Sequence, residues 1–207
     1  MSTVSAMTVP SRRAVLKAGL VLPAVLSACA ADPVPLDTYY RLQPTMTYPP
    51  RPGGPLPGTA EVAPLRGEGI INSRAILYRI SASELRQYTY HFWTEAPAAM
   101  LQRALIDALR GGRAFDQVVS PEMRMARNYE VLGSLRTFEH DTSGNERVLV
   151  ALELGVRKLG AGSAATLKSY AAEEACADGS VAAAVRAFSQ SFDRIAAEFI
   201  NDLGTIG

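Results

Sequence analysis

The sequence predicts a single α+β domain in which an antiparallel or mixed β-sheet carries two main helices packed on one face. Three patterns support this prediction. Residues 146–158 alternate between apolar and more polar side chains, with the period of two of a strand that has one buried face. Residues 97–110 and 180–203 carry apolar side chains three and four positions apart, which places them on one face of each helix.

Four strands are expected before the first helix. They span residues 38–42, 59–63, 75–80 and 85–93. The first is favoured by its aromatic and β-branched residues. The four residues 81–84 between the last two have the length of a hairpin loop, and residues 69–72 are expected to form a turn or a short helical piece.

The first helix is expected to begin at Pro97, because the first turn of a helix does not need the N–H that proline lacks. Gly111 and Gly112 end it. Further strands are expected at residues 115–119, 129–139, 146–158 and 165–172. A turn at residues 141–145 would join two of them, so residues 129–158 are expected to form a long antiparallel hairpin.

The second helix is expected over residues 180–203, with Asp178 or Ser180 as its N-cap. Its apolar positions are Val181, Val185, Phe188, Phe192, Ile195, Phe199 and Leu203. Large side chains dominate this stripe, so we expect it to pack closely on the sheet. Each buried aromatic would then contribute a few kcal/mol, and Phe192→Ala would cost about 3–5 kcal/mol.

Residues 26–29, Leu-Ser-Ala-Cys, follow an apolar run and have the pattern of a lipobox. The thiol of Cys29 could accept a diacylglyceryl group, and small residues at Ser27 and Ala28 would let a membrane-embedded protease hold the extended chain. We therefore expect signal cleavage between Ala28 and Cys29, and a covalent diacylglycerol and N-acyl lipid on Cys29. The alternative is an ordinary secretory signal whose cysteine lies near the cleavage site by chance.

The segment before Cys29 has the composition of an export signal. Arg12, Arg13 and Lys17 are basic, and residues 18–28 are apolar but shorter than the roughly 20 residues that span a bilayer. Arg12 and Arg13 resemble a twin-arginine signal, although paired arginines also occur in ordinary signals, so both export routes stay open. Ala30, rather than the aspartate associated with inner-membrane retention, favours the outer membrane, facing the periplasm.

Three segments are expected along the chain. They are a signal peptide at 1–28, a lipidated N-terminus with a first short strand and a proline-rich linker at 29–58, and the α+β domain at 59–207. Residues 30–64 hold nine of the 13 prolines. Such a composition favours extended polyproline II structure, which predicts a semi-rigid tether between the lipid and the domain. Recognition of these prolines by a partner domain is the alternative.

The charge of the chain gives no indication of nucleic-acid binding. The net charge is +1, and removal of residues 1–28 leaves 18 basic and 20 acidic residues. A near-neutral chain without a basic block does not attract a polyanion. If Cys29 is lipidated, Cys176 has no partner within the chain, so it is either a buried or half-buried apolar residue or the source of an intermolecular disulfide.

We find no motif for catalysis or metal binding in the sequence. His91 and His140 lie far apart, whereas zinc sites need three or four ligands; we expect His91 to be structural and His140 to be solvated. Residues 160–165 match the dinucleotide pattern GxGxxA, but a strand is expected to follow where that site needs a helix, so a plain turn is favoured. Glu173 and Glu174 are expected on a solvated helix or turn face.

Several short blocks follow the Cys29 motif in a fixed order. They are Tyr39-Tyr40-Arg41-Leu42, the strand at 76–80 with Glu84-Leu85, the segment His91-Phe92-Trp93-Thr94-Glu95-Ala96-Pro97, and the pair Tyr129-Glu130-Val131 and Phe138-Glu139, before an alanine-rich last helix. With these blocks the chain resembles the ABC-type transport auxiliary lipoproteins, the PqiC-like proteins, over nearly all of its mature length. It departs from them in the proline-rich residues 48–57 and in the apolar start of the strand at 75–77.

The resemblance implies a non-enzymatic lipoprotein that faces the periplasm. It would dock an MCE-domain protein, with its ABC transporter permease and ATPase, to the outer membrane and so serve the transport of phospholipid or other hydrophobic compounds. A homo-oligomer is also allowed. The alternatives are a lipoprotein that carries lipid in its own apolar pocket and an envelope-anchored enzyme. Tyr39 and Tyr40 are candidates for a partner surface through strand addition, or else an ordinary core strand.

Overall fold

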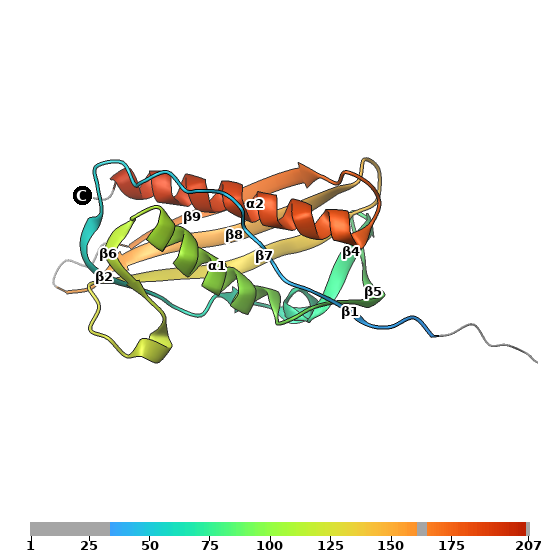
Figure 1. The fold of residues 1–207 in the computed structure, drawn as a ribbon, viewed down its shortest axis with the longest axis horizontal. Coiled ribbons are helices and arrows are strands. Elements are labelled where there is room, and N and C mark those ends of the chain that lie inside the picture. Colours follow the sequence, from blue (N-terminus) through green and yellow to red (C-terminus); the bar gives the residue numbers. More distant parts are fainter. Residues whose placement is uncertain (1–33, 161–164, 206–207) are drawn as a thin grey trace, which may run out of the picture. The chain divides into compact units, whose positions relative to one another are not determined.

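The computed structural model of the protein describes residues 34–160 and 165–205. Residues from Pro35 onward form one compact unit (Figure 1). The strands within these ranges are β1 Thr38–Tyr40, β2 Leu56–Val62, β3 Arg66–Gly67, β4 Ala75–Ser81, β5 Glu84–Trp93, β6 Phe115–Val119, β7 Tyr129–Asp141, β8 Arg147–Lys158 and β9 Ala165–Ala175. The helices are α1 Pro97–Gly111 and α2 Val181–Asp202, with 3-10 turns at Gly69–Asn72, Pro121–Met123 and Leu203–Thr205.

The long strand β7 organises the sheet because both of its edges are paired. Along one edge it runs antiparallel to β8, from Tyr129 opposite Lys158 to Asp141 opposite Arg147, and β8 in turn pairs antiparallel with β9. Along the other edge β7 pairs in parallel with β2, β3 and β4. The strand β6 extends the sheet beyond β2, and β5 and β1 extend it beyond β4. The sheet is therefore mixed, and the predicted hairpin is confirmed.

Both helices cover the same face of this sheet, as predicted (Figure 1). Pro97 occupies the first turn of α1, and α1 ends at Gly111. Ser180 is the N-cap of α2, since its Oγ accepts a hydrogen bond of 3.1 Å from the Ala183 N–H. Asp178, the other candidate cap, accepts from the Ser180 N–H at 2.9 Å. These bonds satisfy backbone donors that the first turn of a helix otherwise leaves free.

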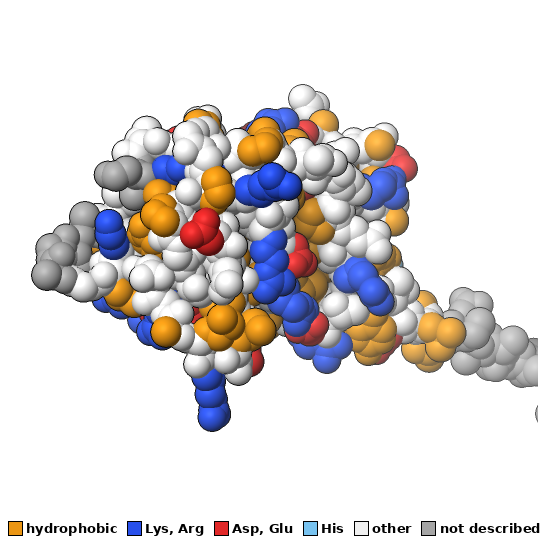
Figure 2. All heavy atoms as spheres, turned by 60° about the vertical axis from the view of Figure 1, so that its left-hand side comes forward, with side chains coloured by type: hydrophobic (Ala, Val, Ile, Leu, Met, Phe, Trp, Pro, Cys, Tyr) orange, Lys and Arg blue, Asp and Glu red, His pale blue; other side chains and the backbone are white. Residues whose placement is uncertain are grey.

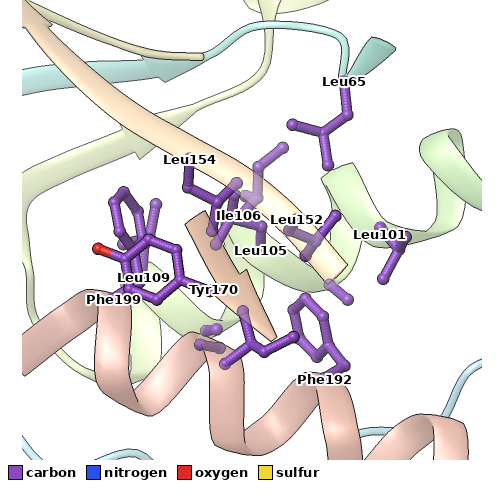
Figure 3. Close-up of a cluster of buried hydrophobic side chains, with 14 of the residues drawn as sticks. Leu65, Leu101, Leu105, Ile106, Leu109, Leu152, Leu154, Tyr170, Phe192 and Phe199 are labelled. Atoms are coloured by element: carbon purple, nitrogen blue, oxygen red, sulfur yellow. The ribbon is translucent and has the colours of Figure 1, made fainter. Parts of the chain in front are cut away.

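The core lies between the sheet and the two helices. Six of the seven apolar positions predicted for the second helix are buried, and Val185 is half-buried. Figure 3 shows Phe192 and Phe199 of α2 in one cluster with leucines of α1 and β8. Near β5, the rings of Trp93, Phe138 and Phe188 lie with centroids 4.3 to 5.4 Å apart. The predicted packing of α2 on the sheet is confirmed.

The proline-rich segment between β1 and β2 departs from the predicted tether. Residues 41–51, which we call the strap, cross in front of α2 (Figure 1). Tyr48 is buried, and Arg51 is 7% exposed, with its Nε donating to the Leu203 carbonyl at 2.9 Å. The spacer prediction is therefore wrong for this part of the chain. Its prolines keep the segment extended, but buried aromatic and polar side chains attach it to the body.

Candidate functional site

The structure reaches only some of the site residues predicted from the sequence. Arg12, Arg13, Ala28 and Cys29 lie outside the described residues, so their roles stay predictions. Within residues 34–160 and 165–205, no three His, Cys, Asp or Glu side chains are grouped so that they could hold a metal ion. No helix in these same ranges has the length and apolar character needed to cross a membrane.

Strand β1 forms an edge of the sheet and turns Tyr39 outward. Tyr39 pairs with Phe92 of β5 and is 54% exposed, and the two rings lie 5.8 Å apart. The guanidinium carbon of Arg74 lies 5.5 Å from the centre of the Tyr39 ring, within the range of a cation–π contact. Leu36, just before the strand, is 87% exposed. This aromatic edge, residues 36–40, therefore offers apolar surface next to an edge strand.

Tyr40 faces the opposite way from Tyr39. It is half-buried, and its hydroxyl shares a hydrogen bond of 3.0 Å with Nδ1 of His91. Burial raises the pKa of Tyr40. The structure thus separates the two predicted surface residues, because Tyr39 is available to a partner and Tyr40 packs inward on His91. The structural role expected for His91 agrees with this contact.

One buried carboxylate on α2 holds the strap. Asp193 is 3% exposed, and its Oδ2 accepts from the backbone N–H groups of Thr45 at 2.9 Å and Met46 at 3.1 Å. Its Oδ1 accepts from the Tyr48 hydroxyl at 2.5 Å. Burial raises the pKa of Tyr48, and the bond to Asp193 raises it further. Three donors thus replace the water that the carboxylate loses, which fixes the strap on the helix.

An open groove of about 670 Å³ lies between the strap and α1. Its apolar lining includes Met46 from the strap and Met100 from α1. Its charged lining includes Arg41 and the ion pair of Arg103 Nη1 and Glu95 Oε2, which lie 2.6 Å apart. The volume is that of a small-ligand site. These charged side chains distinguish the groove from the enclosed apolar pocket that a lipid carrier would need.

His140 corrects the expectation of a solvated side chain. It lies near the end of β7, is 0% exposed, and shares a hydrogen bond of 2.9 Å between its Nδ1 and the Tyr88 hydroxyl. Its Nε2 has no hydrogen-bond partner among the described residues. Burial lowers the pKa of His140, against the opposing effects of Glu146 and Asp141. The prediction failed because strand β7 extends to Asp141, so His140 takes the inward position of a strand rather than a place in the turn.

The end of β9 tests two further expectations. Glu173 and Glu174 lie in this strand rather than on a helix or turn, so that assignment was wrong. Glu173 is exposed, whereas Glu174 is half-buried and forms an ion pair with Arg194. Cys176 is half-buried and packs against the core, which confirms the first of its two interpretations. Burial raises the pKa of its thiol, which keeps the thiol protonated and weakly nucleophilic.

The elements on either side of the glycine-rich motif at 160–165 decide between a turn and a dinucleotide site. β8 ends at Lys158 and β9 begins at Ala165, whereas a phosphate site needs a helix to begin there. Gly160 has a φ of 113°, a conformation that favours glycine. Residues 161–164 lie outside the described part of the chain. The motif therefore connects two antiparallel strands, as expected.

The face of the sheet away from the helices is lined by carboxylates paired with arginines. The carboxylates of Glu61, Glu130, Glu139 and Asp141 belong to residues no more than 9% exposed. Arg157 pairs with Glu130, and Arg79 pairs with Glu139. A guanidinium nitrogen of Arg127 lies 3.3 Å from a carboxylate oxygen of Glu61, and one of Arg147 lies 3.2 Å from a carboxylate oxygen of Asp141. A second hollow of about 670 Å³ opens on these strands. Paired charges of both signs give this open face no strong field of one sign.

A family model for the ABC-type transport auxiliary lipoprotein component matches residues 40–199. The chain belongs to this family. The resemblance found in the sequence is thereby confirmed, and the match runs from the last residue of β1 through the strap and α1 into the last turn of α2. The auxiliary lipoprotein is thus a component of ABC-type transport that is associated with the cell envelope.

Solved structures share the fold of this auxiliary lipoprotein. Protein XCC0632 from Xanthomonas campestris has a TM-score of 0.69 and 20% identity, over 79% of this chain and 93% of its own. An uncharacterized protein has a TM-score of 0.62 and 13% identity, over 80% of this chain and 97% of its own. A PelC dodecamer from Paraburkholderia phytofirmans is more distant, with a TM-score of 0.45, 12% identity and coverage of 77% and 95%. No curated protein matches the chain. For the first two structures, at these identities, the likeness concerns the fold alone.

Sequence reasoning missed Asp193, the residue that fixes the strap of the auxiliary lipoprotein. Its signal was present, because Asp193 lies between Phe192 and Ile195, two positions of the apolar stripe of α2. An acidic residue on or beside a buried stripe must find donors elsewhere in the fold. The identity of those donors, the N–H groups of Thr45 and Met46 and the hydroxyl of Tyr48, depends on long-range contacts that no local pattern contains.

Proposed function

We propose that this auxiliary lipoprotein is a non-enzymatic docking component of an MCE-type ABC transport system. It would face the periplasm, anchored by its lipid in the outer membrane, and would hold an MCE-domain protein together with its permease and ATPase. The cargo would be phospholipid or another hydrophobic compound moved between the two membranes. The family match over residues 40–199 is the observation that carries this proposal.

The features of the body support a binding role rather than a reaction. The described residues contain no cluster suited to a metal ion, and the buried carboxylates on the open face are neutralised by arginines. The two large hollows are open and have charged side chains on their walls. Catalytic sites usually combine a concave pocket with side chains of perturbed pKa that point into it. Docking needs only an accessible surface on a rigid body.

The proposed anchor is the lipid on Cys29. A diacylglycerol with an additional N-acyl chain inserts enough methylene groups for stable attachment, whereas one myristoyl chain binds only marginally. Pro35, where the compact unit begins, is six positions after Cys29. Since an extended chain covers at most about 3.4 Å per residue, Pro35 would stay within roughly 20 Å of the lipid-bearing residue.

Co-purification from the native envelope tests the docking role. The full-length lipoprotein, tagged at its C-terminus, is isolated after gentle solubilisation and its partners are identified by mass spectrometry. We expect an MCE-domain protein and an ABC ATPase in amounts comparable to the lipoprotein. Their absence from a preparation that retains intact lipoprotein would refute the docking proposal, and recovery of bound lipid alone would favour the lipid-carrying alternative.

A separate experiment tests the anchor. The intact mass of the mature protein should correspond to a chain that starts at Cys29 and carries three acyl chains. Cys29→Ser should move the protein from the membrane fraction to the soluble periplasm, or leave the signal uncleaved. An unmodified thiol at Cys29 in the native protein would exclude the lipid anchor without excluding the docking role. Replacing Arg12 and Arg13 with lysine would block export only if the twin-arginine route is used.

A further inference from the structure

The loop between β6 and β7 carries two exposed methionines, one of which, Met123, is the most exposed methionine among the described residues. We call residues 120–128 the Met-Arg loop, after Met123, Arg124 and Met125 at its tip. Met123 is 55% exposed and Met125 is 39% exposed. Figure 2 shows hydrophobic side chains beside a projecting basic side chain at the lower edge of the molecule, the level at which Figure 1 places this loop.

The base of the Met-Arg loop is fixed to β2 and to Leu159, the residue that follows β8. The Asn128 N–H donates to the Thr59 carbonyl at 2.8 Å, and Asn128 Oδ1 accepts from the Thr59 N–H at 3.0 Å. The Leu159 N–H donates to the Asn128 carbonyl at 2.8 Å. Gly58, with a φ of 108°, leaves room for Asn128, because a Cβ there would lie 2.3 Å from Asn128 Oδ1. The loop is therefore held in place although its surface is exposed.

Arg127 strengthens the base of the loop through ion pairs, whereas Arg124 at the tip of the loop forms none with the residues that the structure describes. Arg127 contacts Glu61 at 3.3 Å and Glu130 at 3.8 Å, so its charge is compensated. Arg124 is exposed, and no carboxylate in the described part of the chain pairs with it. Its φ of 50° places it in the left-handed region, which costs a side-chain-bearing residue energy that glycine would avoid. Arg124 takes this conformation as the C-cap of the 3-10 turn Pro121–Met123, where the chain leaves the turn.

The Met-Arg loop lies far from the point where the chain enters the compact unit. It immediately precedes Tyr129, the first residue of β7, whereas β1 joins the sheet through β5 and β4 at the other end of β7. Thirteen residues of strand separate the two ends, which is about 40 Å at 3.3 Å per residue. If Cys29 carries the proposed lipid anchor, six positions before Pro35, the β1 end would stay near the membrane, and the loop would lie at the far end of β7.

We propose that the Met-Arg loop inserts into an acidic, apolar-lined surface of the periplasmic transport component that the lipoprotein docks. The two methionines are flexible and polarizable, so they suit a shallow apolar groove. Arg124 would pair with a carboxylate at the rim of that groove, which the body itself does not supply. This inference rests on the proposed function, and it assigns the partner a specific chemistry. A protein partner is favoured over a bilayer because the loop lies at the end opposite the anchor.

The test uses the full-length lipoprotein in its native envelope and measures the recovery of the MCE-domain protein. The loop variant combines Met123→Ser, Arg124→Glu and Met125→Ser. The matched control combines Ile70→Ser and Arg186→Glu, which changes an exposed apolar residue in the Gly69–Asn72 turn and an exposed arginine on α2. We expect the loop variant to lower recovery about tenfold or more, as for an interface hot spot, and the control to leave recovery unchanged.

Two single substitutions separate charge from backbone strain. Arg124→Gly removes the charge but relieves the left-handed conformation, so it should fold at least as well and still lose binding. Arg124→Lys keeps the charge and should retain most of the binding. If Arg124→Gly binds like the unchanged protein, the proposed pairing of Arg124 is wrong. These variants remain informative if the triple variant folds poorly.

The outcomes distinguish this inference from the proposed function. If the unchanged protein recovers no MCE-domain protein, the docking function itself fails. If it does recover that protein and the loop variant recovers as much, only the role of the Met-Arg loop is overturned. Vesicles of phosphatidylglycerol and phosphatidylcholine provide the third arm. Loss of vesicle binding in the loop variant, with MCE recovery intact, would assign the loop to a lipid surface and overturn the proposal.

Discussion

The two faces of the sheet are built from alternate residues of the same strands, yet different forces stabilise them. On β7, Val131 and Phe138 point toward the helices and are 0% and 2% exposed. Their neighbours Glu130 and Glu139 face the other way and are almost as buried, at 9% and 6%. The apolar residues need only close packing, whereas each carboxylate depends on an arginine whose own side chain reaches into water.

This difference separates stability from recognition in the molecule. Burial of apolar side chains contributes roughly 25 cal/mol per Å², so the helix-covered face supplies most of the folding free energy. An ion pair open to water contributes little, because solvent screens it and its side chains lose conformational freedom. The open face and the loops at its ends can therefore vary for partner binding without loss of the fold. Substitutions on the two faces should differ accordingly.

Phe192→Ala should have the largest effect, because it removes a fully buried ring from the centre of the helix-covered face. We expect the free energy of unfolding to fall by about 3–5 kcal/mol. Urea unfolding followed by circular dichroism measures this, with Gln190→Ala as a control at an exposed position of the same helix. A loss as small as that of the control would contradict the assignment of stability to this face.

Asp193→Ala should have the second-largest effect, because Asp193 is a polar residue with a structural role on the same helix. Loss of the carboxylate leaves the N–H groups of Thr45 and Met46 and the Tyr48 hydroxyl without their acceptor. We expect a cost of about 2–3 kcal/mol. The strap should also loosen, which limited trypsin digestion would report as faster cleavage after the exposed Arg41. Unchanged cleavage after Arg41 would mean that the strap is held by its other contacts.

His140 provides a test by pH. Burial lowers its pKa below the usual value of about 6.5, so the unfolded chain binds a proton more readily than the folded protein. Its contribution to stability is therefore complete above about pH 6.5 and is lost as the pH falls toward the lower folded pKa, with a slope of at most about 1.4 kcal/mol per pH unit. Urea unfolding over this range measures the slope, and His140→Phe should flatten it. Equal slopes in both proteins would exclude His140 as the cause.

Much of the fold could be predicted from the sequence, because local periodicity identifies single elements well. The alternation in 146–158 and the stripe of Phe188, Phe192 and Phe199 correspond to β8 and α2. The parallel pairing of β7 with β2, β3 and β4 was not predictable, since it joins strands that are distant in the sequence. Local patterns therefore gave the elements, whereas the order of the strands required the structure.

The candidate sites were less predictable for a related reason. His140 was expected in water because the residues after it form a turn, and its burial depends on Tyr88 from another hairpin. The strap was expected to be a tether because prolines favour extended chains, and Asp193 decides otherwise. Arg124 carries no sequence signal for its left-handed backbone, because that conformation is usual for glycine. Each of these residues takes its role from contacts that are remote in the chain.

Arg157→Gln should have the smallest effect and tests the open face directly. Arg157 pairs with Glu130, but Arg127 also lies 3.8 Å from that carboxylate, so Glu130 keeps a positive neighbour when Arg157 is lost. We therefore expect a cost below about 1 kcal/mol, measured by the same urea unfolding. Adding Arg127→Gln removes the second partner and should cost more than the sum of the two single changes, because a nearly buried carboxylate would then have neither arginine. Additive costs would instead show that water solvates Glu130 well enough, and that the open face contributes to binding alone.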